Sequence, residues 1–181
     1  TQAVFPIYFV MRVSREPSTA GPWKFQPKLQ GVESAWSPDD GTYKLYENYH
    51  REIAGDDIGY RFSYDDLGEG EQVTVRMGVS FVSIENARMN LEAEQQGKTF
   101  DQLRAEATAQ WNRDLGRIRI EGGTPDQQTI FYTALYHALI HPSIISDVNG
   151  EYPKMESGDT GKADYTRYSV FSLWDTYRNL H

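Results

Sequence analysis

The stretch from Ser169 to Arg178 combines an aromatic ring, a carboxylate and a guanidinium within a short span. Trp174 and Asp175 are adjacent, and Arg178 follows three residues after Asp175. An indole ring stacks on the C–H face of a sugar, while a carboxylate accepts hydrogen bonds from vicinal hydroxyls. The same residues also suit packing, with Trp174 in a core and Asp175 paired with Arg178 along a helix. Both interpretations stay open, and Trp174 and Asp175 are the candidate binding residues.

Two histidines have the spacing of a helical metal site. His137 and His141 lie four residues apart, which could bring two imidazoles to one metal ion. The glutamate that follows the first histidine in the zinc-protease motif is absent, because position 138 is alanine. Tyr132 and Tyr136 share the same predicted helix. We therefore favour a packed face of aromatic and histidine side chains over a metal site.

The segment from Asp147 to Glu151 resembles the start of a calcium loop, with oxygen donors at alternate positions. An EF-hand also needs a bidentate glutamate at its twelfth position, which counted from Asp147 is Gly158. The EF-hand is therefore excluded, and an Asx turn around Asn149-Gly150 is the favoured interpretation.

Three pairs of adjacent aspartates, at residues 39–40, 56–57 and 65–66, lie in turn sequences. The acid and base of a glycosidase must face a bond from opposite sides. Neighbours in one turn point in different directions, so we interpret these pairs as solvated turns.

The composition excludes several classes of protein. The 181 residues carry 18 Lys and Arg against 26 Asp and Glu, which gives a formal net charge of −8. Nucleic acids and anionic membranes require clustered basic residues, so neither partner is expected. Without cysteine, a disulfide scaffold, a thiolate zinc site and a cysteine nucleophile are excluded.

The longest apolar run, residues 3–11, contains Pro6 and is far shorter than the roughly 20 residues of a membrane helix. The start at Thr1 and the end at His181 suggest a piece cut from a longer protein.

The first 82 residues have the pattern of short strands. Residues 73–81 alternate strictly between apolar and small or polar types, which predicts a strand with five apolar side chains on one face. Further strands are predicted within residues 3–13, 42–49 and 58–64, separated by turn sequences. Short strands with frequent turns are typical of part of a β-sandwich.

After residue 83 the apolar period becomes helical. Ser83 is a predicted N-cap, and Thr99 with Gln102 and Thr124 with Gln127 form two predicted capping boxes. The third helix begins with Pro125 and is expected to stop near His141-Pro142. The composition of residues 142–165 predicts a long loop. A loop of this length in a compact protein more often has a function than not.

Four segments resemble the family 92 glycoside hydrolases, the calcium-dependent α-mannosidases. They occur in the order of the family and cover about the last 100 residues: 79–88, 131–137 with His141-Pro142, 147–152, and 171–178. The resemblance implies an α+β chain, in which the end of a β-sandwich is followed by linker helices and the first helices of an (α/α)6 barrel. The implied divisions are residues 1–82, 83–122 and 123–181.

The resemblance also implies an activity, namely exo-acting removal of terminal α-linked mannose with inversion. Sugar binding is carried over to Asp175, and with less support to Trp174, in the segment that matches the family's Trp-Asp motif. The family's general acid, general base and Ca²⁺ ligands belong to motifs that this chain does not contain. The expected partners are mannose-containing glycans, the expected location is the periplasm or the outside of the cell, and the isolated chain is expected to be inactive.

Two other functions remain open on the residues alone. One is a non-catalytic carbohydrate-binding module in which the β-rich half binds the glycan. The other is a structural sandwich-and-helix domain without a ligand.

Overall fold

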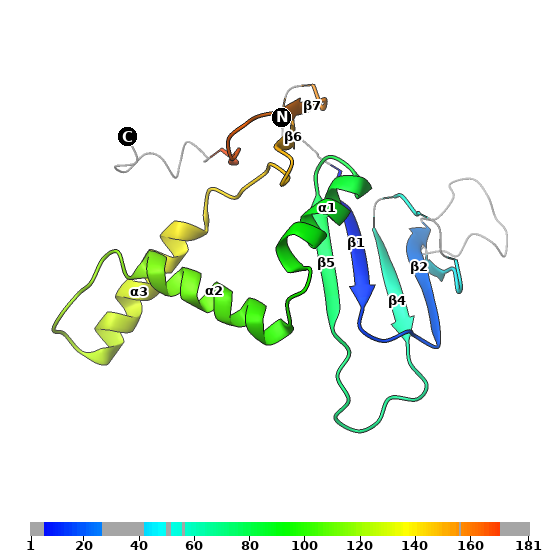
Figure 1. Ribbon diagram of the computed structural model, residues 1–181, viewed down its shortest axis with the longest axis horizontal. Helices are drawn as coiled ribbons and strands as arrows, with labels where there is room; N and C mark the ends of the chain where they lie inside the picture. Colours follow the sequence, from blue (N-terminus) through cyan, green and yellow to red (C-terminus); the bar gives the residue numbers. More distant parts are fainter. Residues whose placement is uncertain (1–5, 27–41, 50–51, 56, 156, 171–181) are drawn as a thin grey trace. The chain divides into compact units, whose positions relative to one another are not determined.

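The structure is a computed structural model with an α+β fold, as the sequence predicts (Figure 1). It describes residues 6–26, 42–49, 52–55, 57–155 and 157–170. These residues form two compact units. One unit comprises Val13–Thr74, and the other combines Thr1–Arg12 with Val75–His181.

The unit Val13–Thr74 contains a three-stranded antiparallel sheet with strand order β3-β2-β4. The strands are β2 (Thr19–Gln26), β3 (Thr42–Leu45) and β4 (Ile58–Ser63). The central strand β2 is absent from the sequence prediction, because Gly21 and Pro22 interrupt its pattern. Pro22 lacks the N–H that a central strand normally donates, yet it is fully buried, and its carbonyl accepts from Tyr46 N at 2.9 Å.

In the second unit, β1 (Tyr8–Val13) pairs with β5 (Val75–Ser80), and α1 (Ile84–Gln95) packs on β5 (Figure 1). The helix covers the small-residue face of the strand, where Gly78 and Ser80 are buried. On the helix, the residues buried in this contact are Ala87 and Leu91. The alternate face of β5, which carries Val75, Met77 and Val79, is about half exposed.

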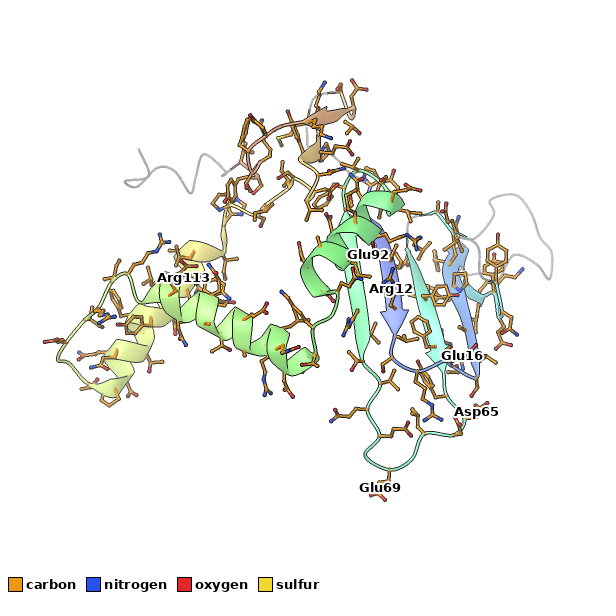
Figure 2. The ribbon with its side chains drawn as sticks, in the orientation of Figure 1. Arg12, Glu16, Asp65, Glu69, Glu92 and Arg113 are labelled. Atoms are coloured by element: carbon orange, nitrogen blue, oxygen red, sulfur yellow. The ribbon has the colours of Figure 1, made fainter. Side chains whose placement is uncertain are left out.

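Polar groups join α1 to the two strands along its length. Arg12 of β1 forms an ion pair with Glu92 of α1 at 2.5 Å, and Figure 2 shows both side chains between the two elements. Arg76 of β5 donates to the carbonyls of Gln95 and Lys98 at the end of the helix. A cation there satisfies carbonyls that have no partner within the helix.

The close approach of α1 to β5 depends on the missing side chain of Gly78. A Cβ at this position would lie 2.2 Å from the carbonyl oxygen of Ala87 and 2.6 Å from Leu91 Cβ. We expect Gly78→Ala to lower the free energy of unfolding by about 2–3 kcal/mol, because the helix must move away from the strand. Urea unfolding of the two proteins measures the difference. Gly68→Ala is the matched control, since the nearest atom to its Cβ would lie at 3.7 Å; equal losses in both variants would contradict the prediction.

Helices α2 (Phe100–Leu115) and α3 (Pro125–Ile140) contact each other and confirm the predicted capping boxes. Trp111 and Tyr136 bring their ring centroids to 4.6 Å between the two helices. Neither helix contains a buried residue among those described. Large apolar side chains are exposed on both, including Phe100 and Ile130.

The segment predicted as a long loop contains a short antiparallel hairpin, β6 (Glu151–Pro153) with β7 (Thr160–Lys162). Strands of three residues are too short to show an alternating pattern, which explains why the sequence predicts only a loop here. No helix in the described part of the chain is long and apolar enough to cross a membrane.

Candidate functional site

The predicted sugar-binding residues, Trp174 and Asp175, lie outside the described residues. The structure does describe the segment that leads into them, up to Val170, and the elements that hold this segment. Two described parts of the chain support this segment: a polar cluster around Asp147, and a ladder that connects the cluster to Val170.

The carboxylate of Asp147 lies at the centre of the polar cluster and is 9% exposed. Ser80 Oγ donates to its Oδ2 at 2.7 Å, and Asn86 Nδ2 donates to the same oxygen at 2.8 Å. Asn90 Nδ2 donates to Oδ1 at 2.7 Å. Both oxygens of a buried carboxylate are thus occupied by neutral donors from β5 and α1, which offsets the cost of removing the charge from water.

The orientation of Asn90 is set by three hydrogen bonds. Its Nδ2 also donates to the carbonyl of Val79 at 2.8 Å, while its Oδ1 accepts from Val148 N at 3.0 Å. Turning the amide over would therefore place donor against donor and acceptor against acceptor. Asn90 can only donate toward Asp147.

Asn86 is fixed in a similar way, and it also reaches the β6 hairpin. Its Nδ2 donates to Glu151 Oε2 at 2.9 Å, and its Oδ1 accepts from Asn149 Nδ2 at 3.3 Å. Asn86 is 4% exposed, so these bonds lie away from water. One side chain of α1 thus holds both Asp147 and Glu151.

The turn between Asp147 and Glu151 is the predicted Asx turn. Asn149 Oδ1 accepts from Glu151 N at 3.0 Å, and Gly150 N donates to the carbonyl of Asp147 at 2.9 Å. Gly150 has φ +83°, and a Cβ there would lie 2.2 Å from the carbonyl oxygen of Ala163. Both observations require glycine at this position.

The pKa of the Glu151 carboxyl is lowered, first by the hydrogen bond from Asn86, then by one from Asn149 and by the charge of Lys162. A carboxyl with a lowered pKa in the folded state adds stability above its unfolded pKa of about 4.3, and this stability is lost as the pH falls through the folded value. We expect the unfolding free energy of the wild type to exceed that of Glu151→Gln at pH 7. The difference should shrink below about pH 4. Urea unfolding at a series of pH values tests this, and a difference that stays constant from pH 7 to pH 3 would contradict it.

The described residues do not form a metal site. None of the described parts of the chain brings together three or more His, Asp or Glu side chains that could hold an ion. The oxygens of Asp147 are occupied by N–H and O–H donors, which a cation would have to displace. His141 is the C-cap of α3 in extended conformation, and its Nε2 lies 3.2 Å from the carbonyl oxygen of Val170. The two histidines are thus not on one helix face, because the helix ends at Ile140.

A two-stranded ladder connects the polar cluster to Val170. Ile145 N donates to the carbonyl of Arg167 at 2.9 Å, and Ser169 N donates to the carbonyl of Ser143 at 2.8 Å. Two side chains add to the ladder: Ser169 Oγ accepts from Ser143 N at 3.0 Å, and Ser146 Oγ accepts from Arg167 N at 3.0 Å. Residues 143–146 therefore hold residues 167–169 in place, directly before the segment that contains Trp174 and Asp175.

The sequence did not predict the polar cluster, although it contains a signal for it. Ser83, Asn86 and Asn90 repeat at three and four residues, the same period as the apolar face of α1. Polar side chains at this spacing indicate a helix face that turns toward a polar partner. The partner, Asp147, lies 57 residues from Asn90 in the chain and could not be identified from spacing.

Comparison with known proteins decides the family. The family model of the glycosyl hydrolase family 92 catalytic domain matches residues 86–181, more than half of the chain. The chain belongs to glycosyl hydrolase family 92. The family 92 chain therefore carries the polar cluster, apart from Ser80, within the matched residues.

Solved structures of the same family resemble the family 92 chain over nearly its whole length. A family GH92 α-mannosidase from Bacteroides thetaiotaomicron is 30% identical, with a TM-score of 0.68 over 95% of this chain and 21% of that one. The same mannosidase has been solved in complex with mannoimidazole. A family GH92 inverting mannosidase from the same organism is 26% identical, with a TM-score of 0.68, again over 95% of this chain and 21% of that one.

A curated relative adds one further observation. A protein of Arthroderma benhamiae described as an uncharacterized secreted glycosidase is 34% identical over 112 residues, which cover 60% of the family 92 chain and 14% of the relative. The family 92 chain thus spans about a fifth of the solved mannosidases and a smaller part of this relative.

Proposed function

We propose that the chain is part of a longer exo-acting α-mannosidase that removes terminal α-linked mannose with inversion. The observation that carries this proposal is the similarity to two family GH92 mannosidases at 30% and 26% identity, one of them named as inverting. The substrates are mannose-containing glycans. The relative named as secreted supports a location in the periplasm or outside the cell.

In the proposed architecture the chain contains the junction between a β-sandwich and an (α/α)6 barrel. Strands β1 to β5 precede helices α1 to α3 along the chain, as such a junction requires, and the short strands β6 and β7 follow the helices. The half-exposed apolar face of β5 and the uncovered apolar side chains of α2 and α3 support this proposal, because further elements of a longer protein would bury them. The residue divisions at 82 and 122 remain a prediction.

Hydrolysis with inversion requires two carboxyl groups with different roles. One carboxylic acid protonates the leaving oxygen, while a carboxylate takes a proton from the water that attacks the anomeric carbon from the opposite face. The products are the shortened glycan and β-mannose. In our proposal both groups lie outside this chain, which contributes Asp175 to bind sugar hydroxyls and Trp174 to stack on the ring. In our proposal Ca²⁺ binds the sugar through ligands outside this chain; among the described residues, no three His, Asp or Glu side chains come together in a way that could hold an ion.

A non-catalytic carbohydrate-binding module is a second candidate, favoured by one surface of the unit Val13–Thr74. Tyr43 is 59% exposed, its ring lies 5.3 Å from Trp23, and its hydroxyl donates to Asp57 at 2.8 Å. Exposed rings beside a carboxylate are suited to a sugar. In this case Tyr43→Ala would remove glycan binding and leave hydrolysis unchanged.

Hydrolysis followed by proton NMR tests the proposed function. The full-length protein should release mannose from an α-mannoside, with the β-anomer appearing first, and should leave α-glucosides intact. The isolated 181 residues should release none. Absence of mannose release from the full-length protein in the presence of Ca²⁺, or the α-anomer appearing first, would overturn the proposal.

A further inference from the structure

The turn between Asp147 and Glu151 contains the one Asn-Gly sequence of the chain, Asn149-Gly150. Glycine has no side chain to hinder its amide nitrogen, so in a flexible chain this nitrogen readily attacks the side-chain amide of the preceding asparagine. We propose that Asn149 is a deamidation site that the folded chain protects, and that opening of the polar cluster exposes it. The proposal does not depend on the proposed function, because it concerns a reaction of the chain itself with water.

The reaction consumes one water molecule and releases one ammonia molecule. Gly150 N first attacks Cγ of Asn149, and the new N–Cγ bond closes a succinimide ring. The Cγ–Nδ2 bond breaks, and the proton from Gly150 N leaves with Nδ2 as ammonia. Water then adds to one of the two ring carbonyls and opens the ring, which gives aspartate or isoaspartate at position 149. No oxidant, reductant or other reagent is required.

The attacking nitrogen is engaged in the structure. Gly150 N donates to the carbonyl of Asp147 at 2.9 Å, and the carbonyl of Gly150 accepts from Ala163 N at 2.9 Å. The backbone of Gly150 has φ +83°, and the carbonyl oxygen of Ala163 lies 2.2 Å from the place that a Cβ would occupy. Hydrogen bonds depend on direction, so Gly150 cannot turn its nitrogen toward Asn149 while these bonds are closed.

The side chain under attack is held as well. Asn149 Oδ1 accepts from Glu151 N at 3.0 Å, and its Nδ2 donates to Asn86 Oδ1 at 3.3 Å. Asn86 is 4% exposed and is itself bonded to Asp147 and Glu151, so it gives a fixed partner. Ring closure requires the Asn149 amide to rotate toward Gly150, and this rotation breaks both of its bonds.

Ring closure is therefore expected only in molecules whose turn has opened. Local openings of a native protein occur with a free energy below that of global unfolding. When opening and closing are fast compared with the reaction, the observed rate equals the rate in an open chain multiplied by the open fraction. A change that raises the open fraction about tenfold thus raises the rate of deamidation by the same factor.

The product cannot rebuild the cluster. Aspartate at position 149 places an acceptor oxygen where Nδ2 of Asn149 donated, directly against Oδ1 of Asn86. Asn86 cannot turn over, because its Nδ2 holds Asp147 and Glu151. The new charge also joins the charges of these two carboxylates within one turn, where like charges repel. Deamidation thus makes an opening of the cluster irreversible.

The test compares the full-length protein with a peptide of residues 145–153, which reports the rate of the unprotected sequence. Asn90→Ala and the milder Ser80→Ala loosen the cluster, because each removes a bond to Asp147 and neither contacts Asn149. Glu94→Ala is the matched control, since Glu94 is exposed on the same helix and makes no hydrogen bond or ion pair with another described residue.

Mass spectrometry after digestion measures aspartate and isoaspartate at position 149 over time, at neutral pH and at a temperature where each variant is folded by circular dichroism. Isoaspartate identifies the succinimide, because direct hydrolysis of the side-chain amide gives aspartate alone. Hydrogen exchange at the amide of Ala163 measures the open fraction independently.

We expect Asn149 in the wild type to deamidate at least about 100-fold more slowly than in the peptide. Both cluster variants should deamidate about tenfold faster than the wild type, with exchange at Ala163 accelerated by a similar factor, and the control should match the wild type. A wild-type rate within about threefold of the peptide, or aspartate without isoaspartate, would overturn the proposal. Faster exchange with unchanged deamidation would do the same. If Asn90→Ala does not fold, Ser80→Ala and the ratio of wild type to peptide still decide.

Discussion

Replacing Asp147 by asparagine is expected to lower the free energy of unfolding by about 4 kcal/mol. The new amide has the shape of the carboxylate, but one of its two acceptor oxygens becomes a donor. Whichever oxygen is replaced, the new N–H₂ faces a donor: Asn90 Nδ2 on one side, or Asn86 Nδ2 and the Ser80 hydroxyl on the other.

The two asparagine side chains cannot turn to accept from the new amide, and Ser80 Oγ already accepts from Val82 N at 2.9 Å and from Ser83 N at 3.4 Å. Asn90 is held by Val79 and Val148, and Asn86 is held by Glu151 and Asn149. Each hydrogen bond to a charged group contributes about 1.5–3 kcal/mol, and a buried donor without a partner costs about 1–3 kcal/mol. The loss of one or two such bonds, together with unpaired donors, accounts for the expected size of the effect.

Urea unfolding of the chain, followed by circular dichroism, measures the change in Asp147→Asn as a lower midpoint at unchanged slope. Asp164→Asn is the matched control, since Asp164 is exposed and forms no hydrogen bond or ion pair with the described residues. A loss below about 1 kcal/mol, comparable to the control, would mean that the carboxylate is not the centre of the cluster.

The helices illustrate what local sequence determines. Thr99 and Thr124 each form the predicted capping box. The threonine side chain accepts a hydrogen bond from the backbone N–H of the glutamine three residues later, and the glutamine side chain accepts one from the backbone N–H of the threonine. These signals are local, because all partners lie within four residues, and so they can be read without knowing the fold. The strand of residues 75–80 is similarly local, and its alternation is confirmed.

Which face of strand β5 is buried cannot be predicted from local sequence in the same way. Val75, Met77 and Val79 would form the buried face by the usual rule, yet α1 covers Gly78 and Ser80 instead. Only a strand face with small side chains lets a helix come this close. The choice of face depends on the partner that approaches it, which a pattern within one strand cannot specify.

The candidate site shows the same limit at longer range. The Asx turn at Asn149 was predictable, since it involves a side chain and a backbone N–H two residues apart. The role of the turn depends on Ser80, Asn86 and Asn90, which are 57 to 67 residues from Asp147. Contacts of this separation are set by the packing of α1 on β5, and no spacing rule predicts them.

Asp175→Ala in the full-length protein is expected to reduce kcat/KM for α-mannosides by a factor of about 100 or more. In the proposed function this carboxylate accepts hydrogen bonds from two sugar hydroxyls, and each charged bond contributes about 1.5–3 kcal/mol. A loss of about 3 kcal/mol in transition-state stabilisation corresponds to a factor of more than 100 in rate. Trp174→Phe should cost less, about tenfold, because a smaller ring still stacks on the sugar.

Initial rates of mannose release distinguish the two proposed functions through this variant. If Asp175 binds the reacting sugar, turnover falls while glycan binding at Tyr43, where present, is unaffected. If the chain binds glycans only through the unit Val13–Thr74, Asp175→Ala leaves turnover within threefold of the wild type, and the assignment of the sugar site is wrong. Asp164→Ala serves as the control, because it removes an exposed carboxylate eleven residues earlier in the same connecting segment. A comparable loss in both variants would indicate a general effect of net charge, since the proposed contact belongs to Asp175 alone.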